Sequence, residues 1–438
     1  MCATLTVSFA ALFASAASAA TPPKCASDID CSLNGVCDTS SGVCTCDPGW
    51  TSGVDGVLGV SALPFCSFLD MLPSPVSACG PACAFHGGET SLNTNWSSWG
   101  MSVIEADGLF HGFVAEMANE CTLSAWTKGS QVVHVSAPTP LGPFIRSPSA
   151  SVVVPPWSHN PQVIFDETAG LYVIFTLGDG WPQNGPPENC TTHDAQSLKE
   201  TPWSPLVTSR TTPPLRNTGN CTPVTEPSNC SPGPCWQCNI TLHVSQTPDA
   251  PGPWTPVPAT IIGLSNVDNI GNWNPAPMLL PNGSIAVMIH TDDNQGWSGD
   301  VIAVANSWRG PFYVTVPDSA VNNEPDKQED PFMWLDKRGH FHALVHLMFD
   351  PPGNGPCGLW AGGHMSSLDG TSWTPISRAY NTSVTTTDGN VYTFSRRERP
   401  KLIFDSNKNP THIFNGAIPT GGAGGVNTYT IVAPINLN

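Results

Sequence analysis

The sequence predicts an all-β protein in which a five-bladed β-propeller follows a small disulfide-rich module. The composition favours short strands and many turns over long helices, because 45 Pro and 40 Gly stand beside only 11% charged residues. Six cysteines gather between residues 25 and 66. From about residue 90 onward, one strand–turn–strand pattern recurs five times.

The first twenty residues, MCATLTVSFAALFASAASAA, have the apolar core and small-residue end of a signal peptide. We therefore expect a signal peptide over residues 1–20, with cleavage near Ala19 or Ala20. No later stretch is apolar for about 18 residues, so no membrane insertion is predicted. Sixteen cysteines and several N-x-S/T sequons are typical of an oxidising compartment. The sequence thus predicts a secreted, extracellular glycoprotein.

The charge balance excludes one class of partner. The formal net charge is −18, from 34 acidic and 16 basic residues. Nucleic acids and anionic membranes attract basic faces, so neither is an expected partner.

The clustered cysteines predict a small module over residues 21–66. Six cysteines allow fifteen pairings, and spacing alone selects none of them. The stretch from Cys44 to Trp50, CTCDPGW, resembles the end of an EGF-like module. That resemblance implies the pairs Cys25–Cys37, Cys31–Cys44 and Cys46–Cys66. Such a module serves as a spacer or as a docking site for a protein partner, and residues 67–89 are expected to link it to the propeller.

The repeat predicts the propeller, over residues 90–438. Each copy has an apolar strand that commonly starts at a proline, then a turn and an aromatic strand, and such a unit cannot bury itself alone. A Cys/Pro-rich insertion is expected at about 181–239, between the second and third copies. The five copies are WSSWGMSVIEADGLFHGFV (96–114), WSHNPQVIFDETAGLYVIF (157–175), NWNPAPMLLPNGSIAVMIH (272–290), EDPFMWLDKRGHFHALVHL (329–347) and RERPKLIFDSNKNPTHIFN (397–415).

The first strand of each blade lines the central axis, so its starting residues converge on one funnel. Those positions carry polar and aromatic side chains that suit binding to sugar hydroxyls, although polar side chains also fill propeller axes for packing alone. The residues in question are Trp99, His159, Asn160, Trp273, Asn274, Glu329, Asp330, Glu398 and Arg399.

The E-D-P and E-R-P starts of the last two blades resemble those of arabinanase-type five-bladed propellers, including glycoside hydrolase family 43. The resemblance implies a general-acid Glu, a base Asp and a second Asp that tunes pKa values. On this sequence, Glu329 and Glu398 match the acid position, and Asp330 matches the D-P position. Blade one carries Trp99-Gly100-Met101 in place of D-P, so the usual base position is empty.

Glycoside hydrolysis needs two carboxyl groups at a defined separation. Glu329 and Asp330 are neighbours in a strand and are expected to point to opposite faces. The better pair is then one of them with Glu398. We expect Arg397, Arg399 and His159 to hold substrate or to shift a carboxyl pKa.

The three histidines of blade four, His340, His342 and His346, suggest a metal at first sight. We favour a packing or hydrogen-bonding role, because His111 aligns with His342 in the repeat. No metal and no cofactor are predicted, and nothing in the sequence supports a structural ion on the propeller axis.

Two functions remain open from the sequence. The first is a secreted glycosidase-like enzyme acting on a polysaccharide or glycan, with Glu329 or Glu398 as acid and Asp330 as base or pKa-tuning residue. The second is a non-catalytic propeller that binds glycan or protein outside the cell, with the cysteine module as spacer. The missing blade-one Asp favours the second function, whereas the convergent acids, Arg and His favour the first.

Overall fold

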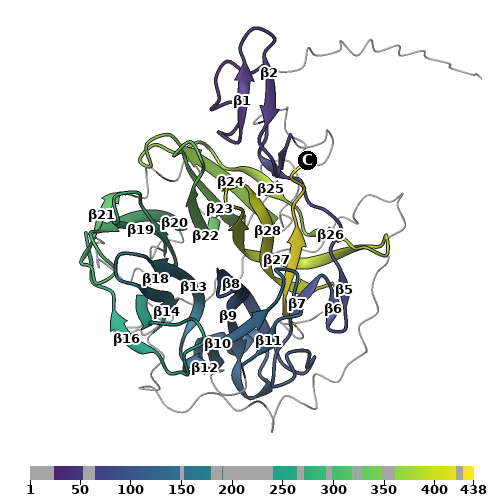
Figure 1. The fold of residues 1–438 in the computed structure, drawn as a ribbon, viewed down its shortest axis with the longest axis vertical. Coiled ribbons are helices and arrows are strands. Elements are labelled where there is room, and N and C mark those ends of the chain that lie inside the picture. Colours follow the sequence, from purple (N-terminus) through teal and green to yellow (C-terminus); the bar gives the residue numbers. More distant parts are fainter. Residues whose placement is uncertain are drawn as a thin grey trace, which may run out of the picture.

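Five antiparallel sheets surround a common centre in the computed structural model, which confirms the predicted propeller (Figure 1). The inner strand of each sheet contacts the inner strands of both neighbours, so they form a closed ring. The structure describes residues 24–52, 65–147, 152–178, 190, 240–263, 271–292, 298–317, 321, 328–347, 361–420 and 428–438.

The first two blades follow the expected order of strands. Within blade one, its second and third strands are joined by 3₁₀ turns at Ala118–Glu120 and Leu123–Ala125 and by the single-turn helix α1 (Trp126–Gly129). Blade one comprises β8 (Ser98–Ala106), β9 (Leu109–Met117), β10 (Ser130–Ala137), β11 (Ile145–Arg146) and β12 (Val152–Val154). Blade two comprises β13 (His159–Asp166), β14 (Leu171–Leu177), β15 (Ile240–Ser245) and β16 (Thr255–Pro258).

The remaining blades repeat the arrangement. Blade three comprises β18 (Gly271–Leu279), β19 (Ile285–Asp292), β20 (Ser298–Ala305) and β21 (Phe312–Val316), with β17 (Ile261–Ile262) parallel to β21. Blade four comprises β22 (Gln328–Leu335), β23 (Phe341–Leu347), β24 (Ala361–Ser367) and β25 (Ser377–Tyr380). Blade five comprises β27 (Val391–Phe404), β28 (Pro410–Pro419) and β29 (Tyr429–Pro434), with β26 (Ser383–Thr385) beside β27.

Local turn chemistry sets the hairpins that the repeat predicted. Asp107 and Gly108 both have positive φ, as a two-residue type I′ turn requires, and they join β8 to β9. In blades two, four and five the turn begins with an Asp whose side chain accepts backbone N–H groups of the turn itself: Asp166, Asp336 and Asp405.

The fifth sheet is completed from the other end of the chain. Strand β7 (Cys83–Phe85) pairs with β29, which closes the ring between blades five and one. The stretch 67–89, expected to be a linker, therefore supplies a propeller strand as well as short pairs, since β5 (Val76–Ser77) pairs with β6 (Gly80–Pro81). Sequence pattern missed β7 because three residues carry no detectable period.

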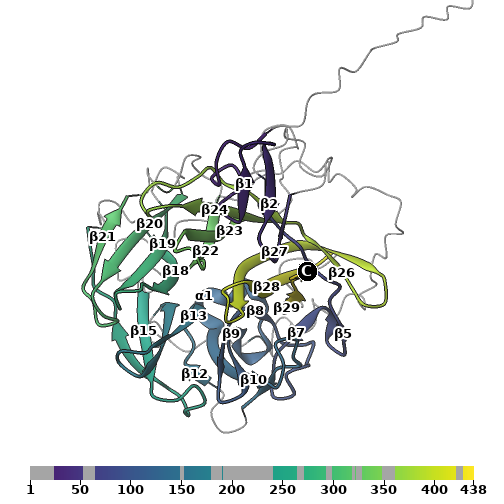
Figure 2. The same ribbon diagram turned by 45° about the horizontal axis from the view of Figure 1, so that its top comes forward.

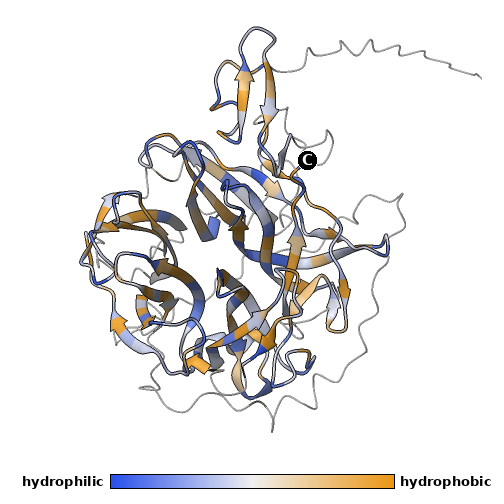
Figure 3. Cartoon of the chain, in the orientation of Figure 1, coloured by the Kyte–Doolittle hydropathy of each residue, from blue (hydrophilic) through white to orange (hydrophobic). Residues whose placement is uncertain are grey.

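The core lies between blades. Val173 and Phe175 of blade two pack against Ile285 and Val287 of blade three, and equivalent clusters join the other neighbours. Hydrophobic and hydrophilic residues are interspersed along the strands (Figure 3), as expected when each sheet has side chains on two faces. The removal of apolar surface from water at these interfaces holds the sheets together.

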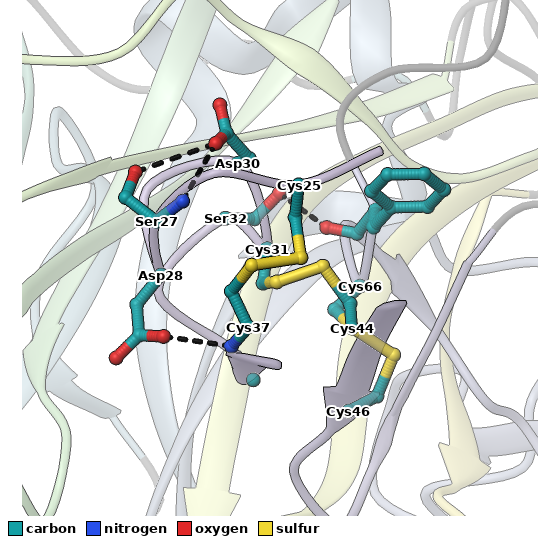
Figure 4. Close-up of a disulfide and its surroundings, with 12 residues drawn as sticks. Cys25, Ser27, Asp28, Asp30, Cys31, Ser32, Cys37, Cys44, Cys46 and Cys66 are labelled. Carbon is teal, nitrogen blue, oxygen red and sulfur yellow. Dashed lines mark hydrogen bonds between the residues drawn. A yellow bond between two sulfur atoms is a disulfide. The ribbon is translucent and has the colours of Figure 1, made fainter. Parts of the chain in front are cut away.

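The N-terminal module is held by disulfides (Figure 4). Its hairpin pairs β1 (Gly35–Asp38) with β2 (Val43–Cys46), and β3 (Trp50–Thr51) pairs with β4 (Phe68–Leu69). The disulfides agree with those that the EGF-like resemblance implied, and they join Cys25 to Cys37, Cys31 to Cys44 and Cys46 to Cys66.

The module docks on blade four rather than standing free of the propeller (Figure 2). The Trp50 ring lies 6.3 Å from that of Trp334 and 4.9 Å from that of His364. The Arg338 guanidinium donates to the carbonyls of Leu33 and Gly35. The apolar core of the module is thus continuous with that of blades four and five.

Two expectations fall on residues that the structure does not describe. The signal peptide over 1–20 lies outside the described residues, as does the insertion at about 181–239 apart from Cys190. Cys190 forms a disulfide with Cys121, just after blade-one strand β9. Within the described part of the chain, no helix is long and apolar enough to cross a membrane.

Replacement of Trp50 by Ala should release the module from the propeller. Loss of a buried Trp costs about 3–5 kcal/mol, and Trp50 is 7% exposed. We expect faster hydrogen exchange at Trp334 and His364 and a comparable loss of unfolding free energy in denaturant titration. Val36→Ala is the control, since Val36 is 53% exposed. Equal exchange and stability in the two variants would contradict this docking.

Candidate active site

Each inner strand carries the same backbone irregularity. The register shifts by a bulge near the start of β8, β13, β18 and β22 and midway along the longer strand β27. One residue inside each bulge adopts the left-handed conformation, which is uncommon for residues other than Gly. The φ angles are 68° at Gly100, 53° at Asn160, 52° at Asn274, 56° at Asp330 and 55° at Arg399.

The bulges bring the side chains of these positions to one pocket on the axis. A bulge re-aims the side chain of its extra residue and breaks the alternation of the strand. Each of the five bulges contributes to the same pocket, as the sequence predicted for strand starts. Its lining consists of Trp99, Gly100, Met101, Asn160, Pro161, Asn274, Pro275, Asp330, Arg399 and Lys401.

The three predicted acids meet beside this pocket. Side-chain oxygens of Glu329, Asp330 and Glu398 and a ring nitrogen of His346 all lie within 4.8 Å of one another. The expectation that Glu329 and Asp330 face opposite ways was wrong, because the alternation on which it rested is interrupted by the bulge between Glu329 and Phe332.

Positive groups hold the acids in place. His346 Nδ1 lies 2.9 Å from Glu329 Oε1, and His346 Nε2 lies 3.5 Å from Glu398 Oε1. Arg396 forms an ion pair with Glu398. Glu329 is the most accessible of the acids, with its side chain 24% exposed, whereas that of Glu398 is 1% exposed.

Asp330 lies opposite a different cation. Arg399 Nη1 is 3.6 Å from Asp330 Oδ1, which is longer than a good hydrogen bond. Asp330 is 2% exposed, and neither of its carboxyl oxygens has a hydrogen-bond partner among the described residues. It is therefore a buried carboxyl group with unused hydrogen-bonding capacity.

These surroundings push the pKa values of the neighbouring acids apart. Burial raises the pKa of Asp330 to about 6; Arg399 opposes this, and the charges of Glu329 and Glu398 add to it. Burial also acts to raise the pKa of Glu329, but hydrogen bonding to His346 and the nearby positive charges bring it well below its usual range. Such divergence is how one site keeps a proton donor beside an ionised carboxylate.

Blade one lacks the carboxylate that its D-P position would supply, and the side chain of Arg399 occupies the space beside Gly100. A Cβ at Gly100 would lie 3.1 Å from both Cβ and Cδ of Arg399. The guanidinium groups of Arg399 and Arg396 also lie over the Trp99 ring, at 6.0 and 5.8 Å from its centroid. The blade-one sector of the site is therefore aromatic and cationic.

Other predicted residues have mixed placements. Asn160 lines the pocket and donates its amide N–H to Asn274 Oδ1, which links blades two and three. His159 is buried, its Nδ1 lies 2.6 Å from Ser130 Oγ, and its ring stacks on Trp126. Burial, with the charge of Arg399, holds the pKa of His159 well below its usual value. The side chain of Trp273 lies outside the described residues.

Arg397 does not line the pocket, contrary to expectation. It is fully buried, donates from Nε to Asn415 Oδ1 at 2.9 Å and lies over the Tyr380 ring. Its neighbour Arg396 reaches the acids instead. The physical reason is strand alternation, which sends adjacent side chains to opposite faces.

Sequence reasoning missed three residues of this site. His346, given a packing role, bonds Glu329, and Arg396 was not singled out. Lys401 lines the pocket, and its burial lowers its pKa to about 7. One available signal was hairpin register, which places His346 directly opposite Glu329.

The repeated histidine interaction that the sequence suggested is present. His111 Nδ1 lies 2.9 Å from His134 Nε2 in blade one, and His342 Nδ1 lies 3.1 Å from His364 Nε2 in blade four. In both blades the pair joins the second strand to the third.

The four groups Glu329, Asp330, His346 and Glu398 are close enough to ligate a cation, but Arg396 and Arg399 already balance their charge.

Comparisons with known proteins agree with this architecture. Residues 25–55 match the family profile described as EGF-like domain. A search of curated proteins by sequence finds no match. Among solved structures, the catalytic domain of a GH62 α-L-arabinofuranosidase from Coprinopsis cinerea is similar, with a TM-score of 0.50 and 12% identity over 84% of this chain and 97% of that one. The two structures share the propeller fold.

Two further structures give weaker similarity. The family 117 glycoside hydrolase Zg3597 from the marine bacterium Zobellia galactanivorans has a TM-score of 0.47 and 12% identity, over 84% of this chain and 90% of that one. An exo-β-1,3-galactanase from Phanerochaete chrysosporium has a TM-score of 0.44 and 10% identity, over 83% of this chain and 63% of that one. At such identities the similarity concerns the fold.

The raised pKa of Asp330 predicts a pH dependence of stability. Between its ordinary value of 3.8 and about 6, the folded protein keeps a proton that the unfolded chain has lost. Asp330 should therefore contribute a fall in the free energy of unfolding as pH rises through this window, by at most about 1.4 kcal/mol per pH unit. Asp330→Asn should remove that slope, measured by denaturant titration between pH 4.5 and 6.

The lower limit of pH 4.5 avoids the opposite contribution of Glu329, whose lowered pKa adds stability as pH rises below that value. Glu105→Gln is the matched control, because Glu105 is an exposed acid at the far end of β8. Parallel curves for wild type and Asp330→Asn would show that Asp330 does not titrate in this range.

Proposed function

We propose that this protein is a secreted glycoside hydrolase acting on a polysaccharide or glycan at the propeller axis. The observation that carries the proposal is the pairing of a buried carboxyl of raised pKa, Asp330, with an ionised carboxylate of lowered pKa, Glu329. Glycoside hydrolysis uses one carboxylic acid to protonate the leaving oxygen. A second, ionised carboxylate attacks the anomeric carbon or activates a water that does so. The disulfide-stapled module and the sequence of residues 1–20 support secretion.

The proposed roles differ from those that the family resemblance implied. Asp330 holds the proton and acts as general acid, because its burial favours the neutral form. Glu329 is the ionised partner, since it is the most exposed acid and bonds His346. Glu398, in contact with His346 and Arg396, positions that histidine. Oxygen separations within 4.8 Å favour a retaining reaction, whose carboxyl groups lie about 5–5.5 Å apart.

The surroundings of the acids suit a sugar. The amides of Asn160 and Asn274 supply hydrogen-bonding groups from two blades. Trp99 is buried beneath the guanidinium groups of Arg396 and Arg399, and it supports these two cations at the pocket. Lys401 and Arg399 add donors. Few polar groups in fixed positions among apolar walls are typical of small-molecule sites.

One observation favours the second candidate, a propeller that binds glycan without cleaving it. The carboxylate of Glu398 is already engaged by Arg396 and His346, and Asp330 faces Arg399. Cations so close to these acids stabilise the ionised carboxylates in the protein without substrate. In this case the pocket would bind sugar through the same residues with no turnover.

Substitution of the acids separates the two functions. We would assay the secreted protein first on polysaccharides that bear α-L-arabinofuranosides, and then on a wider polysaccharide panel. The first choice follows from the similar fold of an α-L-arabinofuranosidase. Asp330→Asn should lower kcat by about 10²–10⁴-fold, the contribution of a general acid. Glu329→Gln should lower kcat by at least as much, because it removes the carboxylate that a retaining reaction needs as nucleophile. Glu105→Gln should leave kcat unchanged.

Hydrolysis that survives Glu329→Gln and Asp330→Asn together would contradict the assignment. Binding to a polysaccharide that is lost on Asn160→Ala, with no hydrolysis by wild type, would establish the non-catalytic function instead. Both outcomes can be read from affinity gel electrophoresis and reducing-sugar release on the same samples.

A further inference from the structure

The turn of blade four holds a second cluster of ligating groups, remote from the axis. One atom from each of Asp336, His340 and His342 lies within 4.8 Å of the other two. Asp336 Oδ2 is 3.3 Å from His340 Nδ1 and 3.7 Å from His342 Nε2. The turn lies between β22 and β23, where the EGF-like module docks.

These separations fit the edges of a zinc coordination shell. Zinc binds His nitrogen and carboxylate oxygen at about 2.0–2.2 Å, so tetrahedral ligands stand roughly 3.3–3.6 Å apart. The two measured separations, 3.3 and 3.7 Å, agree with that spacing. The longer one is too long for a good hydrogen bond, so direct bonding between His342 and Asp336 does not account for it.

The Nε2 of His342 faces Asp336 at a distance longer than a good hydrogen bond. His342 Nδ1 lies 3.1 Å from His364 Nε2, a nitrogen that also accepts a hydrogen bond from Asn34 Nδ2 at 3.3 Å. His342 is fully buried, and its Nε2 has no hydrogen-bond partner among the described residues. A buried ring nitrogen 3.7 Å from a carboxylate oxygen leaves a position between them that a cation would fill.

The carboxylate of Asp336 is also held in a fixed orientation. Asp336 Oδ1 accepts the backbone N–H groups of Arg338 and His340, both at 2.8 Å, and Arg338 Nε donates to Oδ2 at 3.0 Å. Metal-ligating carboxylates and imidazoles typically have such outer partners, which fix their orientation. The charge of Arg338 is balanced by Asp47, whose Oδ2 lies 2.5 Å from Nη2.

Two residues that orient the ligands from outside, Asn34 and Asp47, belong to the EGF-like module. Asn34 orients His342 through His364, and Asp47 holds Arg338 against Asp336. All three inner ligands, in contrast, belong to blade four. His340 is 19% exposed and Asp336 13%, so a fourth position remains open to solvent.

We propose that Asp336, His340 and His342 form a binding site for a zinc-type divalent cation, completed by solvent and oriented by the docked module. Cation binding and module docking are then linked, each strengthening the other. We expected a packing role for these histidines because the repeat pattern does not reveal the turn geometry that brings Asp336 to them. This site is independent of the proposed glycosidase activity.

Zinc binding by the full chain tests the proposal. Protein freed of metal by a chelator would be titrated with ZnCl₂ by calorimetry and by thermal unfolding. We expect one site and a rise in Tm, with Co²⁺ giving the absorption bands of a tetrahedral complex. His340→Ala should weaken zinc affinity at least 100-fold. His412→Ala, which removes another partly buried histidine, should leave the affinity unchanged.

A separate variant tests the link between zinc binding and docking of the EGF-like module. Asp47→Ala leaves the three ligands intact and should weaken zinc affinity by about 10–100-fold, as loss of an outer partner does. Zinc binding by His340→Ala equal to that of wild type, or affinity of wild type weaker than about 100 µM, would overturn the site. Unchanged affinity in Asp47→Ala would overturn the link to the module.

Discussion

The left-handed residue in the bulge of each inner strand is the constraint on which the axis depends. A residue other than Gly costs about 1–2 kcal/mol in this conformation, and Asn160, Asn274, Asp330 and Arg399 all adopt it. Such strain persists only where the surroundings enforce it, and it concentrates at functional sites. Here the enforcing structure is the sheet on either side of each bulge. The strained backbone points four polar side chains at one pocket.

The rest of the fold holds those bulges in register. Apolar clusters lie between adjacent blades, so no blade is stable without its neighbours. Strand β7 closes the ring, which fixes the distance between blade five, with Glu398 and Arg399, and blade one, with Trp99. The module adds a second brace, because Trp50 joins the core shared by blades four and five. Blades four and five are also the blades that carry the three acids.

Much of the fold followed from the sequence, because repeats and cysteine spacing are local signals. Five proline-marked or aromatic strand starts predicted five blades, and Glu329, Asp330 and Glu398 were placed at the axis by phase alone. Closure by β7 could not be predicted, because a three-residue strand has no period. Arg396 takes the place expected of Arg397 because it lies two residues from Glu398 and shares its face of the strand. The meeting of Glu329 with Asp330 depends on a bulge, which a strict two-residue alternation does not foresee. The role of His346 depended on cross-strand register.

A crystal structure of the Asp330→Asn variant with an oligosaccharide cleaved by the wild type is the most direct test that the strained bulges build a glycosidase site. The account predicts a sugar in the axial pocket, hydrogen-bonded to the amides of Asn160 and Asn274, with its anomeric carbon within about 3.5 Å of a Glu329 oxygen and its glycosidic oxygen facing residue 330. A sugar bound on the outer rim, with the axial pocket empty and Glu329 still paired only with His346, would contradict it.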